Sequence, residues 1–204
     1  SSSWICRNRE TAAGRSAEKR NIILAALFMV LANRYDWQLF LEVTGPGGSG
    51  KSIMAEIATM LAGADNSVSA SIETLESSRE RAAVIGYSLI RLPDQEKWSG
   101  DGAGLKAITG GDAVEIRGLW VNGGDAVIPA VVLIANNDPC QFTNDAGAVE
   151  RRRVLFNFPD PVPEHERDPQ LISKLKRELP AIFRDILEEF KTPEEAKEEL
   201  RKAR

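Results

Sequence analysis

Residues 45 to 52 read GPGGSGKS, and their types and spacing are suited to holding a chain of phosphates. The glycines let the backbone turn tightly and point successive N–H groups at phosphate oxygens, which larger residues would obstruct. Lys51 would reach the β and γ phosphates, and the hydroxyl of Ser52 would hold Mg²⁺. The sequence therefore predicts a site for ATP and Mg²⁺, with contacts from the whole loop: Gly45, Pro46, Gly47, Gly48, Ser49, Gly50, Lys51 and Ser52.

The segments on either side of this loop have the apolar patterns that the motif requires. Before the loop, Leu39, Leu41 and Val43 alternate as in a strand. After the loop, apolar residues recur at helical spacing: Ile53, Met54, Ile57, Ala58 and Leu61. A strand, a glycine-rich loop and a helix in this order are the context in which such a loop binds phosphate. A chance match to the pattern is therefore the weaker interpretation.

Acidic residues follow another predicted strand, SLIRL at 88–92. Asp94 comes directly after it and is predicted to hold Mg²⁺ through water. Glu96 lies two residues further on and is the candidate that orients or deprotonates the attacking water. The alternative is that PDQEKW is an ordinary polar turn after a strand.

Two further candidates come from the second half of the chain. The apolar strand VVLIA ends in Asn136 and Asn137, and a polar amide at that place can touch the γ phosphate and position water, although asparagine is also a common turn residue. Arg151 and Arg152, with Arg153, directly precede the strand VLFNF. One of these arginines is predicted to reach a phosphate in a neighbouring subunit and stabilise charge in the transition state. The alternative is a solvated basic turn paired with Glu150 and nearby acids.

The order of the predicted elements indicates an α/β fold. Helices are expected over 10–34, 73–86, 102–111 and 168–202, and further strands over 68–72, 131–135 and 154–158, with a hairpin around residues 122–124. Strands that are apolar on both faces and alternate with helices form a mostly parallel sheet covered on both sides. Chemistry is then expected at the carboxyl ends of the strands.

The bulk composition limits the possible partners. A chain of 204 residues is long enough for one α/β domain with a small helical appendage. The net charge of −4 argues against a generally basic surface that coats nucleic acid, but it leaves a local basic patch open. The apolar run at 22–32 is too short to span a membrane, and Cys6 and Cys140 lack metal-ligand spacing. We therefore expect a cytoplasmic protein without a membrane segment. The start at Ser1 to Ser3 and the abrupt polar end also suggest a fragment cut from a longer chain.

Together these motifs resemble the helicase domain of phage and plasmid primase-helicases, which belongs to superfamily 3. The resemblance rests on GPGGSGKS, Asp94, GDGAGLKAITGGDAVEIR, VVLIANNDP, and ERRRVLFNF followed by DPQLISKLKRELPAIFRDIL, and it covers about residues 20 to 190. It implies a P-loop NTPase of the AAA-plus type with a five-stranded sheet and a β-hairpin insertion. It also divides the chain into an N-terminal helical segment (1–36), an ATPase core (37–162) and a C-terminal helical segment (163–204).

The resemblance also implies an activity and a set of partners. Members of this family hydrolyse ATP as rings, usually hexamers, translocate on single-stranded DNA and separate the duplex during replication of a mobile element in a bacterial host. A primase domain, fused or separate, is the expected companion. Lys51 and Ser52 match the phosphate-loop residues, Asp94 the metal carboxylate, Asn136 the sensor amide, and Arg151 or Arg152 the arginine finger. Gln95 stands where relatives often have a second acid.

DNA contacts are expected near the hairpin. The family's hairpin carries a basic residue near its tip, whereas the corresponding stretch here is RGLWVNGG. Lys106, Arg117 and Trp120 are the candidates, with Trp120 able to stack on a base or to anchor the hairpin in the core. The weakly basic hairpin leaves an alternative open, an oligomeric module that is switched by ATP and loads DNA without unwinding it. A small-molecule kinase is disfavoured because such an enzyme does not need the hairpin or the order of Asn and Arg.

Overall fold

A five-stranded parallel sheet forms the centre of the computed structural model of this chain, which describes residues 17–95, 98–117, 123–143 and 146–204. The strands are β1 (Phe40–Thr44), β2 (Ser67–Ser69), β3 (Leu89–Pro93), β7 (Val131–Asn136) and β9 (Arg153–Asn157). They lie in the order β2-β3-β7-β1-β9, and every neighbouring pair is parallel. The prediction of an α/β fold with a mostly parallel five-stranded sheet is confirmed.

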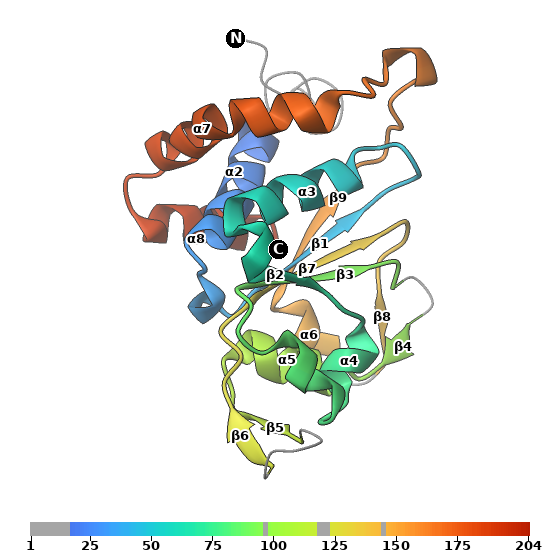
Figure 1. The fold of residues 1–204 in the computed structure, drawn as a ribbon, viewed down its shortest axis with the longest axis vertical. Helices are drawn as coiled ribbons and strands as arrows, with labels where there is room; N and C mark the ends of the chain where they lie inside the picture. The colour runs from blue at the N-terminus through green and yellow to red at the C-terminus, as the bar shows by residue number, and fades with distance from the viewer. Residues whose placement is uncertain (1–16, 96–97, 118–122, 144–145) are drawn as a thin grey trace.

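Helices cover both faces of this sheet and give the molecule three layers (Figure 1). One layer consists of α2 (Ala17–Leu31), α3 (Lys51–Ala62), α7 (Leu171–Glu189) and α8 (Pro193–Lys202). The other consists of α4 (Ile72–Glu76), α5 (Ala103–Gly110) and α6 (Ala146–Glu150). Each layer closes its own apolar core, because successive residues of a strand point to opposite faces. In β1, for example, Leu41 and Val43 belong to the first core and Phe40 to the second.

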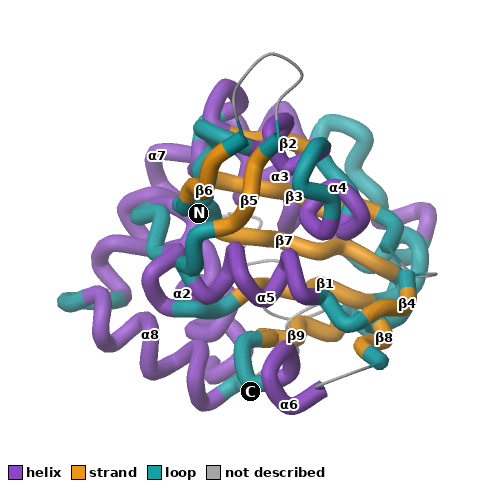
Figure 2. The backbone as a smooth tube through the Cα atoms, turned by 90° about the horizontal axis from the view of Figure 1, so that it is seen from below, coloured by secondary structure: helices purple, strands orange, loops and turns teal. Residues whose placement is uncertain are grey.

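Smaller elements connect the layers. The short strands β5 (Val114–Ile116) and β6 (Gly124–Ala126) form an antiparallel hairpin, as expected, and it lies at the end of the molecule opposite α7 (Figures 1 and 2). A second pair, β4 (Ser99–Gly100) and β8 (Gln141–Phe142), is parallel and was not expected. Single turns of 3₁₀ helix complete the chain: η1 (Tyr35–Trp37), η2 (Ala64–Asn66), η3 (Glu80–Val84) and η4 (Glu164–Glu166).

Two predicted helices are each divided in the structure. The helix expected over 73–86 is instead α4 followed by η3. The guanidinium of Arg81 donates to the carbonyls of Leu75 (2.6 Å) and Glu76 (3.1 Å), the last two residues of α4. The side chain of Arg81 therefore occupies the carbonyl acceptors that further backbone N–H groups would use if the helix continued. The stretch 168–202 divides into α7 and α8, because Thr192 caps α8 through the N–H of Glu195 and is followed by Pro193, which has no N–H of its own.

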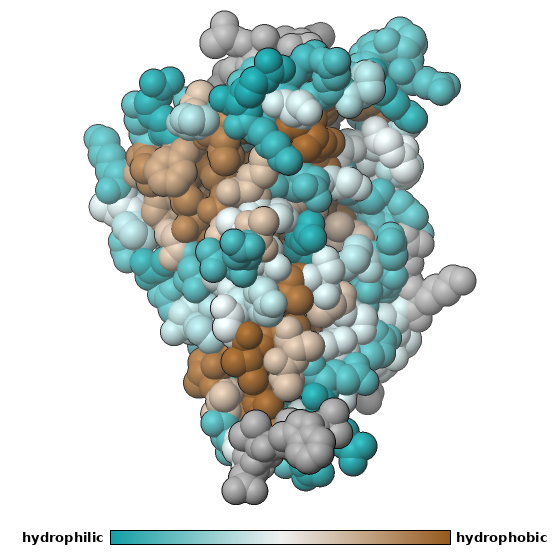
Figure 3. All heavy atoms as spheres, in the orientation of Figure 1, coloured by the Kyte–Doolittle hydropathy of each residue, from teal (hydrophilic) through white to brown (hydrophobic). Residues whose placement is uncertain are grey.

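Part of the helical layer remains exposed. Phe183 and Leu187, one turn apart on α7, are 43% and 49% exposed. Figure 3 shows apolar surface gathered over these helices at the upper left of the molecule. Within the described residues, no helix combines the length and the apolar character needed to cross a bilayer.

A charged pair lies inside the core on the α5 side of the sheet. Glu42, in the central strand β1, is fully buried, and its two carboxylate oxygens accept the N–H of Cys140 (2.7 Å) and face Nε of Arg153 (2.7 Å). Burial raises the pKa of the Glu42 carboxyl, and the contacts with Cys140 and Arg153 only partly offset this effect. Burial also raises the pKa of the neighbouring Cys140 thiol to about 12. The pair therefore ties β1, β9 and the segment after β7 together.

Removing one member of this pair is expected to cost much more than removing both. Arg153→Leu leaves the Glu42 carboxylate buried without its cation and should lower the free energy of unfolding by about 3–5 kcal/mol. Glu42→Leu combined with Arg153→Leu removes both charges and should recover most of this loss. Urea unfolding of the three proteins checks the prediction, which is contradicted if the double variant is no more stable than Arg153→Leu.

Candidate functional site

The loop between β1 and α3 has the backbone shape that its glycines predict. Gly45, Gly48 and Gly50 have φ angles of +146°, +79° and +105°, a region that favours glycine. A side chain at Gly45 would also collide with the carbonyl oxygen of Phe158. Ser49 Oγ is buried and has no hydrogen-bond partner among the described residues. The loop is therefore a compact turn at the start of α3, a place where N–H groups can bind an anion.

Lys51 lies at the centre of this turn. Its ammonium donates to the carbonyl oxygens of Gly45 and Pro46 (3.0 Å for the latter) and to Oδ1 of Asn137 (2.8 Å). Asn137 directly follows β7, the strand beside β1, and its own carbonyl accepts the N–H of Gly45. The positive charge is thus positioned between the loop and the end of the next strand, where a phosphate oxygen would replace neutral acceptors.

Asp94 lies at the carboxyl end of β3, one strand beyond β7. It has a left-handed backbone (φ +55°), and its N–H donates to the carbonyl of Ala135. The side chain is exposed and lines the same pocket as Lys51 and Ser52. Within the described residues, no group of three or more His, Cys, Asp or Glu side chains could hold a metal ion. Ser52 and Asp94 are the predicted Mg²⁺ ligands, and both line this pocket.

The residues after Asp94 differ in their surroundings. Gln95 is turned inward, where its amide accepts the N–H of Ile72 (2.8 Å) and donates to the carbonyl of Pro93 (2.5 Å). The side chain of Gln95 therefore packs in the core, and of these two residues Asp94 lines the pocket. Glu96, the candidate for positioning water, lies outside the described residues, so that role stays a prediction.

The two asparagines after β7 are oriented differently. Asn136 is fully buried, accepts the N–H of Gln95 (2.6 Å) through Oδ1 and contacts Sγ of Cys140 (3.1 Å) through Nδ2. In this structure Asn136 does not line the pocket, whereas Asn137 does and contacts Lys51. Of the two asparagines, Asn137 is therefore the one whose amide is at the pocket, because successive side chains of a strand alternate between faces.

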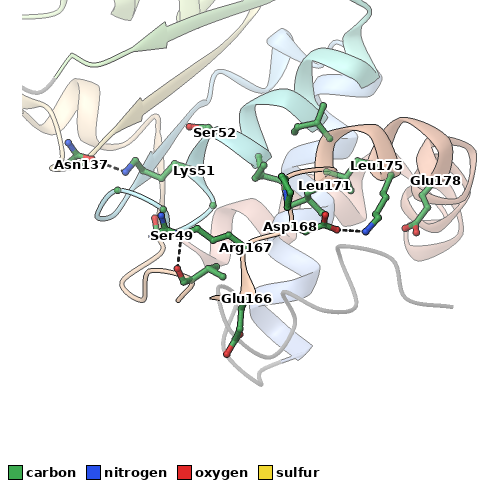
Figure 4. A pocket seen from close by; sticks show the side chains of 18 of the residues that line it. Ser49, Lys51, Ser52, Asn137, Glu166, Arg167, Asp168, Leu171, Leu175 and Glu178 are labelled. Atoms are coloured by element: carbon green, nitrogen blue, oxygen red, sulfur yellow. Dashed lines mark hydrogen bonds and ion pairs between the residues drawn. The ribbon is translucent and has the colours of Figure 1, made fainter. Parts of the chain in front are cut away.

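The pocket next to the loop has a volume of about 710 Å³ and is completed by a segment that sequence reasoning did not assign to the site. Figure 4 shows the loop with Ser49 and Lys51 on one side and α7 with Leu175 and Glu178 on the other. The added lining comes from residues 162–178, the connection into α7 and its first two turns. The sequence contains no motif for these residues, since only the packing of α7 on α3 brings them to the loop.

Arg167 contacts the loop directly from this segment. Its Nε donates to the carbonyl of Val162 (2.9 Å), and the N–H of Val162 donates to the carbonyl of Gly48 (3.0 Å). A Cβ atom placed on Gly48 would lie 2.6 Å from Nη2 of Arg167. Arg167 therefore adds a second positive charge to the phosphate end of the pocket, beside Lys51.

The three arginines before β9 lie far from the loop of their own chain. Arg153 pairs with Phe40 at the start of β1, whereas the loop follows Thr44 at its end, four residues or about 13 Å away along the strand. The guanidinium of Arg153 forms ion pairs with the carboxylates of Glu42 and Glu150. Arg152 is partly buried and donates to the carbonyl of Ala148 (2.7 Å). Arg151 is exposed and forms no hydrogen bond or ion pair through its side chain with the described residues.

The candidates for DNA contact are not gathered into a basic patch in the described part of the hairpin. Lys106 is partly buried on α5, and Arg117, which follows β5, is paired with Glu115 at 2.7 Å. Asp112 and Asp125 add negative charge around the same hairpin. Trp120 lies outside the described residues.

The fold is shared with solved structures of a larger protein. No protein-family model matches the chain. An apo structure of the NrS-1 C-terminal region aligns with a TM-score of 0.67 at 14% identity, covering 98% of this chain and 50% of that one. Another apo structure of this region, its A form, has a TM-score of 0.67 at 11% identity and covers 89% and 44%. The chain thus spans about half the length of these structures, and at such identity the likeness shows the fold alone.

A structure of JCV helicase with a bound small molecule aligns more weakly. Its TM-score is 0.44 at 17% identity, with 85% of this chain and 52% of that one covered. Similarity at this level carries no argument about the present chain.

The left-handed backbone of Gly48 predicts unequal effects of two neighbouring substitutions. Gly48→Ala places a side chain on a residue with φ +79° and also displaces the nearby Arg167 guanidinium, so it should weaken ATP binding by about tenfold or more, since 1.4 kcal/mol of strain suffices. Gly47→Ala is the matched control, because a Cβ there meets nothing within 4 Å. Calorimetric titration with Mg²⁺-ATP measures both, and equal loss in the two variants would contradict this account of the loop.

Proposed function

We propose that this chain binds and hydrolyses ATP with Mg²⁺ and acts as the motor domain of a ring-shaped DNA helicase. The observation that carries the proposal is the position of the Lys51 ammonium. It lies inside a glycine-rich turn at the start of α3, between that turn and Asn137 at the end of β7, with Asp94 lining the same pocket. Lysine, backbone N–H groups and a strand-end carboxylate in this arrangement suit a triphosphate and its metal.

Each residue of the pocket has a separate task in this proposal. The N–H groups of the loop and the ammonium of Lys51 bind phosphate oxygens and stabilise the charge that develops on them. Ser52 and Asp94 hold Mg²⁺, which neutralises phosphate charge when it is bound. Asn137, on the pocket side of the strand end, orients the attacking water, and Arg167 adds a cation from the same chain. Glu96 remains the candidate for the base.

The position of the arginines in the sheet supports the proposed ring. Arg151 is exposed at the amino edge of the sheet, whereas the phosphate loop is at the carboxyl edge. A single chain therefore does not bring Arg151 to its own nucleotide. In a closed ring, Arg151 of one subunit would complete the site of the next and supply the positive charge of an arginine finger. Arg152 is the second candidate.

The remaining parts of the proposal rest on the sequence resemblance. They are a hexameric ring, translocation on single-stranded DNA, a primase companion, and a role in replication of a phage, plasmid or integrated element in the bacterial cytoplasm. A second function is favoured by the acidic surroundings of the hairpin, where Glu115 pairs with Arg117. In this alternative the chain is an oligomeric initiator or DNA-loading module that ATP switches, without unwinding.

A mixing experiment tests the shared site. Lys51→Ala should lower ATP turnover by at least about 10²-fold. Arg151→Ala should lower it by about 10³ to 10⁵-fold if it is the finger. An equal mixture of the two inactive variants should regain about a quarter of the wild-type rate, because one site in four then combines an intact Lys51 with an intact Arg151 from the next subunit.

The control for this experiment is Arg184→Ala, an exposed arginine on α7, which should keep the wild-type rate. The wild-type rate per subunit should also rise with protein concentration. Failure of the mixture to regain activity, together with a rate that is flat in concentration, would exclude a site shared between subunits.

The response of the protein to DNA distinguishes the two proposed functions. A helicase should hydrolyse ATP faster with single-stranded DNA and displace a labelled strand from a forked duplex, whereas a loading module should bind DNA without displacing the strand. If the hairpin grips DNA, Arg117→Ala should lower the slope of log affinity against log salt by about 1. An unchanged slope would remove Arg117 from the DNA contacts.

A further inference from the structure

The pocket extends well beyond the part that would hold phosphates. It continues from the loop along the first turns of α7, where Leu171, Leu175 and Glu178 lie on one face of the helix. In Figure 4, Glu178 lies at the end of the pocket opposite Ser49 and Lys51. With a triphosphate in the loop, this far end is the space left for the nucleoside.

The wall of this far end is mainly apolar. Ile53, from the first turn of α3, faces the pocket together with Leu171, Ile172 and Leu175 of α7. Leu175 is buried in the core, so the wall is anchored in the packed layer. An apolar wall with few polar groups is the usual surface for a flat aromatic ligand such as a nucleobase, and the polar groups then decide specificity.

The carboxylates that line the pocket differ in their partners. Asp94 and Glu166 are exposed to solvent. Asp168 accepts the ammonium of Lys174 (2.5 Å) and the N–H of Gln170 (2.9 Å). Glu178, by contrast, has one oxygen, Oε2, that is buried and without a hydrogen-bond partner among the described residues. A buried acceptor in a pocket calls for a donor from a ligand.

Lys174, the residue placed to form a helical ion pair with Glu178, pairs with another carboxylate instead. Lys174 lies four residues earlier on α7, at the spacing of a helical ion pair, but its ammonium contacts Asp168. Asp168, the partner of Lys174, lies on the side of Glu178 that faces the loop (Figure 4). Glu178 is therefore left to face the nucleoside end of the pocket with an unused acceptor.

We propose that Glu178 accepts a hydrogen bond from the nucleoside and makes the pocket selective for nucleotides that carry a donor at this point. The inference rests on the proposed binding of a nucleoside triphosphate by the loop. The donor is either the exocyclic amine of the base or a ribose hydroxyl. Because a site built around a buried acceptor rejects a ligand without the matching donor, Glu178 is a specificity residue, separate from the catalytic groups around Lys51.

The test compares ligands that differ by one donor. Wild type, Glu178→Ala and the matched control Glu188→Ala are titrated calorimetrically, in the presence of Mg²⁺, with ATP, its analogue lacking the 6-amino group, 2′-deoxy-ATP, 3′-deoxy-ATP and inorganic triphosphate. Alanine preserves helix propensity at both positions, and Glu188 is an exposed residue of α7 outside the pocket.

We expect wild type and Glu188→Ala to bind one of the three analogues about tenfold or more weakly than ATP, and that analogue identifies the donor. Glu178→Ala should bind ATP about tenfold more weakly and lose this discrimination, while its affinity for inorganic triphosphate stays unchanged. Loss of discrimination without loss of triphosphate binding is a result that general damage to the fold would not produce.

Other results would overturn the inference, and they are distinguishable. If wild type binds inorganic triphosphate but treats ATP and all analogues alike, or if Glu178→Ala binds ATP as tightly as wild type, the role of Glu178 is wrong and the phosphate loop stands. If wild type binds neither ATP nor inorganic triphosphate, the proposed function fails and this inference with it.

Discussion

The register of β1 within the parallel sheet is the constraint on which the rest of this site depends. Thr44 pairs with Asn136 of β7, so the phosphate loop begins beside Asn137 and Lys51 can reach that amide. At the other end of the strand, Phe40 pairs with Arg153. Residues 151–153 therefore lie at the amino edge of the sheet, opposite the loop. One strand thus separates the two groups of positive charge that the proposed reaction needs, and in the proposed ring a second subunit would bring them together.

The interior of β1 holds a buried charge. Glu42 is buried at the centre of an apolar core, and burial raises the pKa of its carboxyl even though Arg153 lies against it. The pair connects three segments that meet the site: β1 before the loop, Cys140 after β7, and the arginine turn before β9. Of the adjacent arginines, Arg153 is therefore structural, whereas Arg151 is exposed.

The C-terminal helices give the pocket its second wall. Ile182 and Ile186 pack α7 against the same core as α3, so the first turns of α7 face the loop. Arg167 contacts the phosphate end of the pocket, and Glu178 lies at the far end (Figure 4). Part of the segment expected as a separate C-terminal helical segment (163–204) therefore lines the pocket. Binding at the loop and the position of α7 are physically connected through these contacts.

The sequence by itself determined the strand, loop and helix around Lys51, the parallel sheet and the carboxylate at Asp94, because glycine spacing and apolar periodicity are local properties of the chain. Only the tertiary structure decided that Asn137 and not Asn136 lines the pocket, that Arg153 pairs with Glu42, and that Glu178 lines the pocket at all. These outcomes depend on which face of the strand or helix a side chain occupies and on which distant segment packs against it. The spacing of residues along the sequence does not determine either of these.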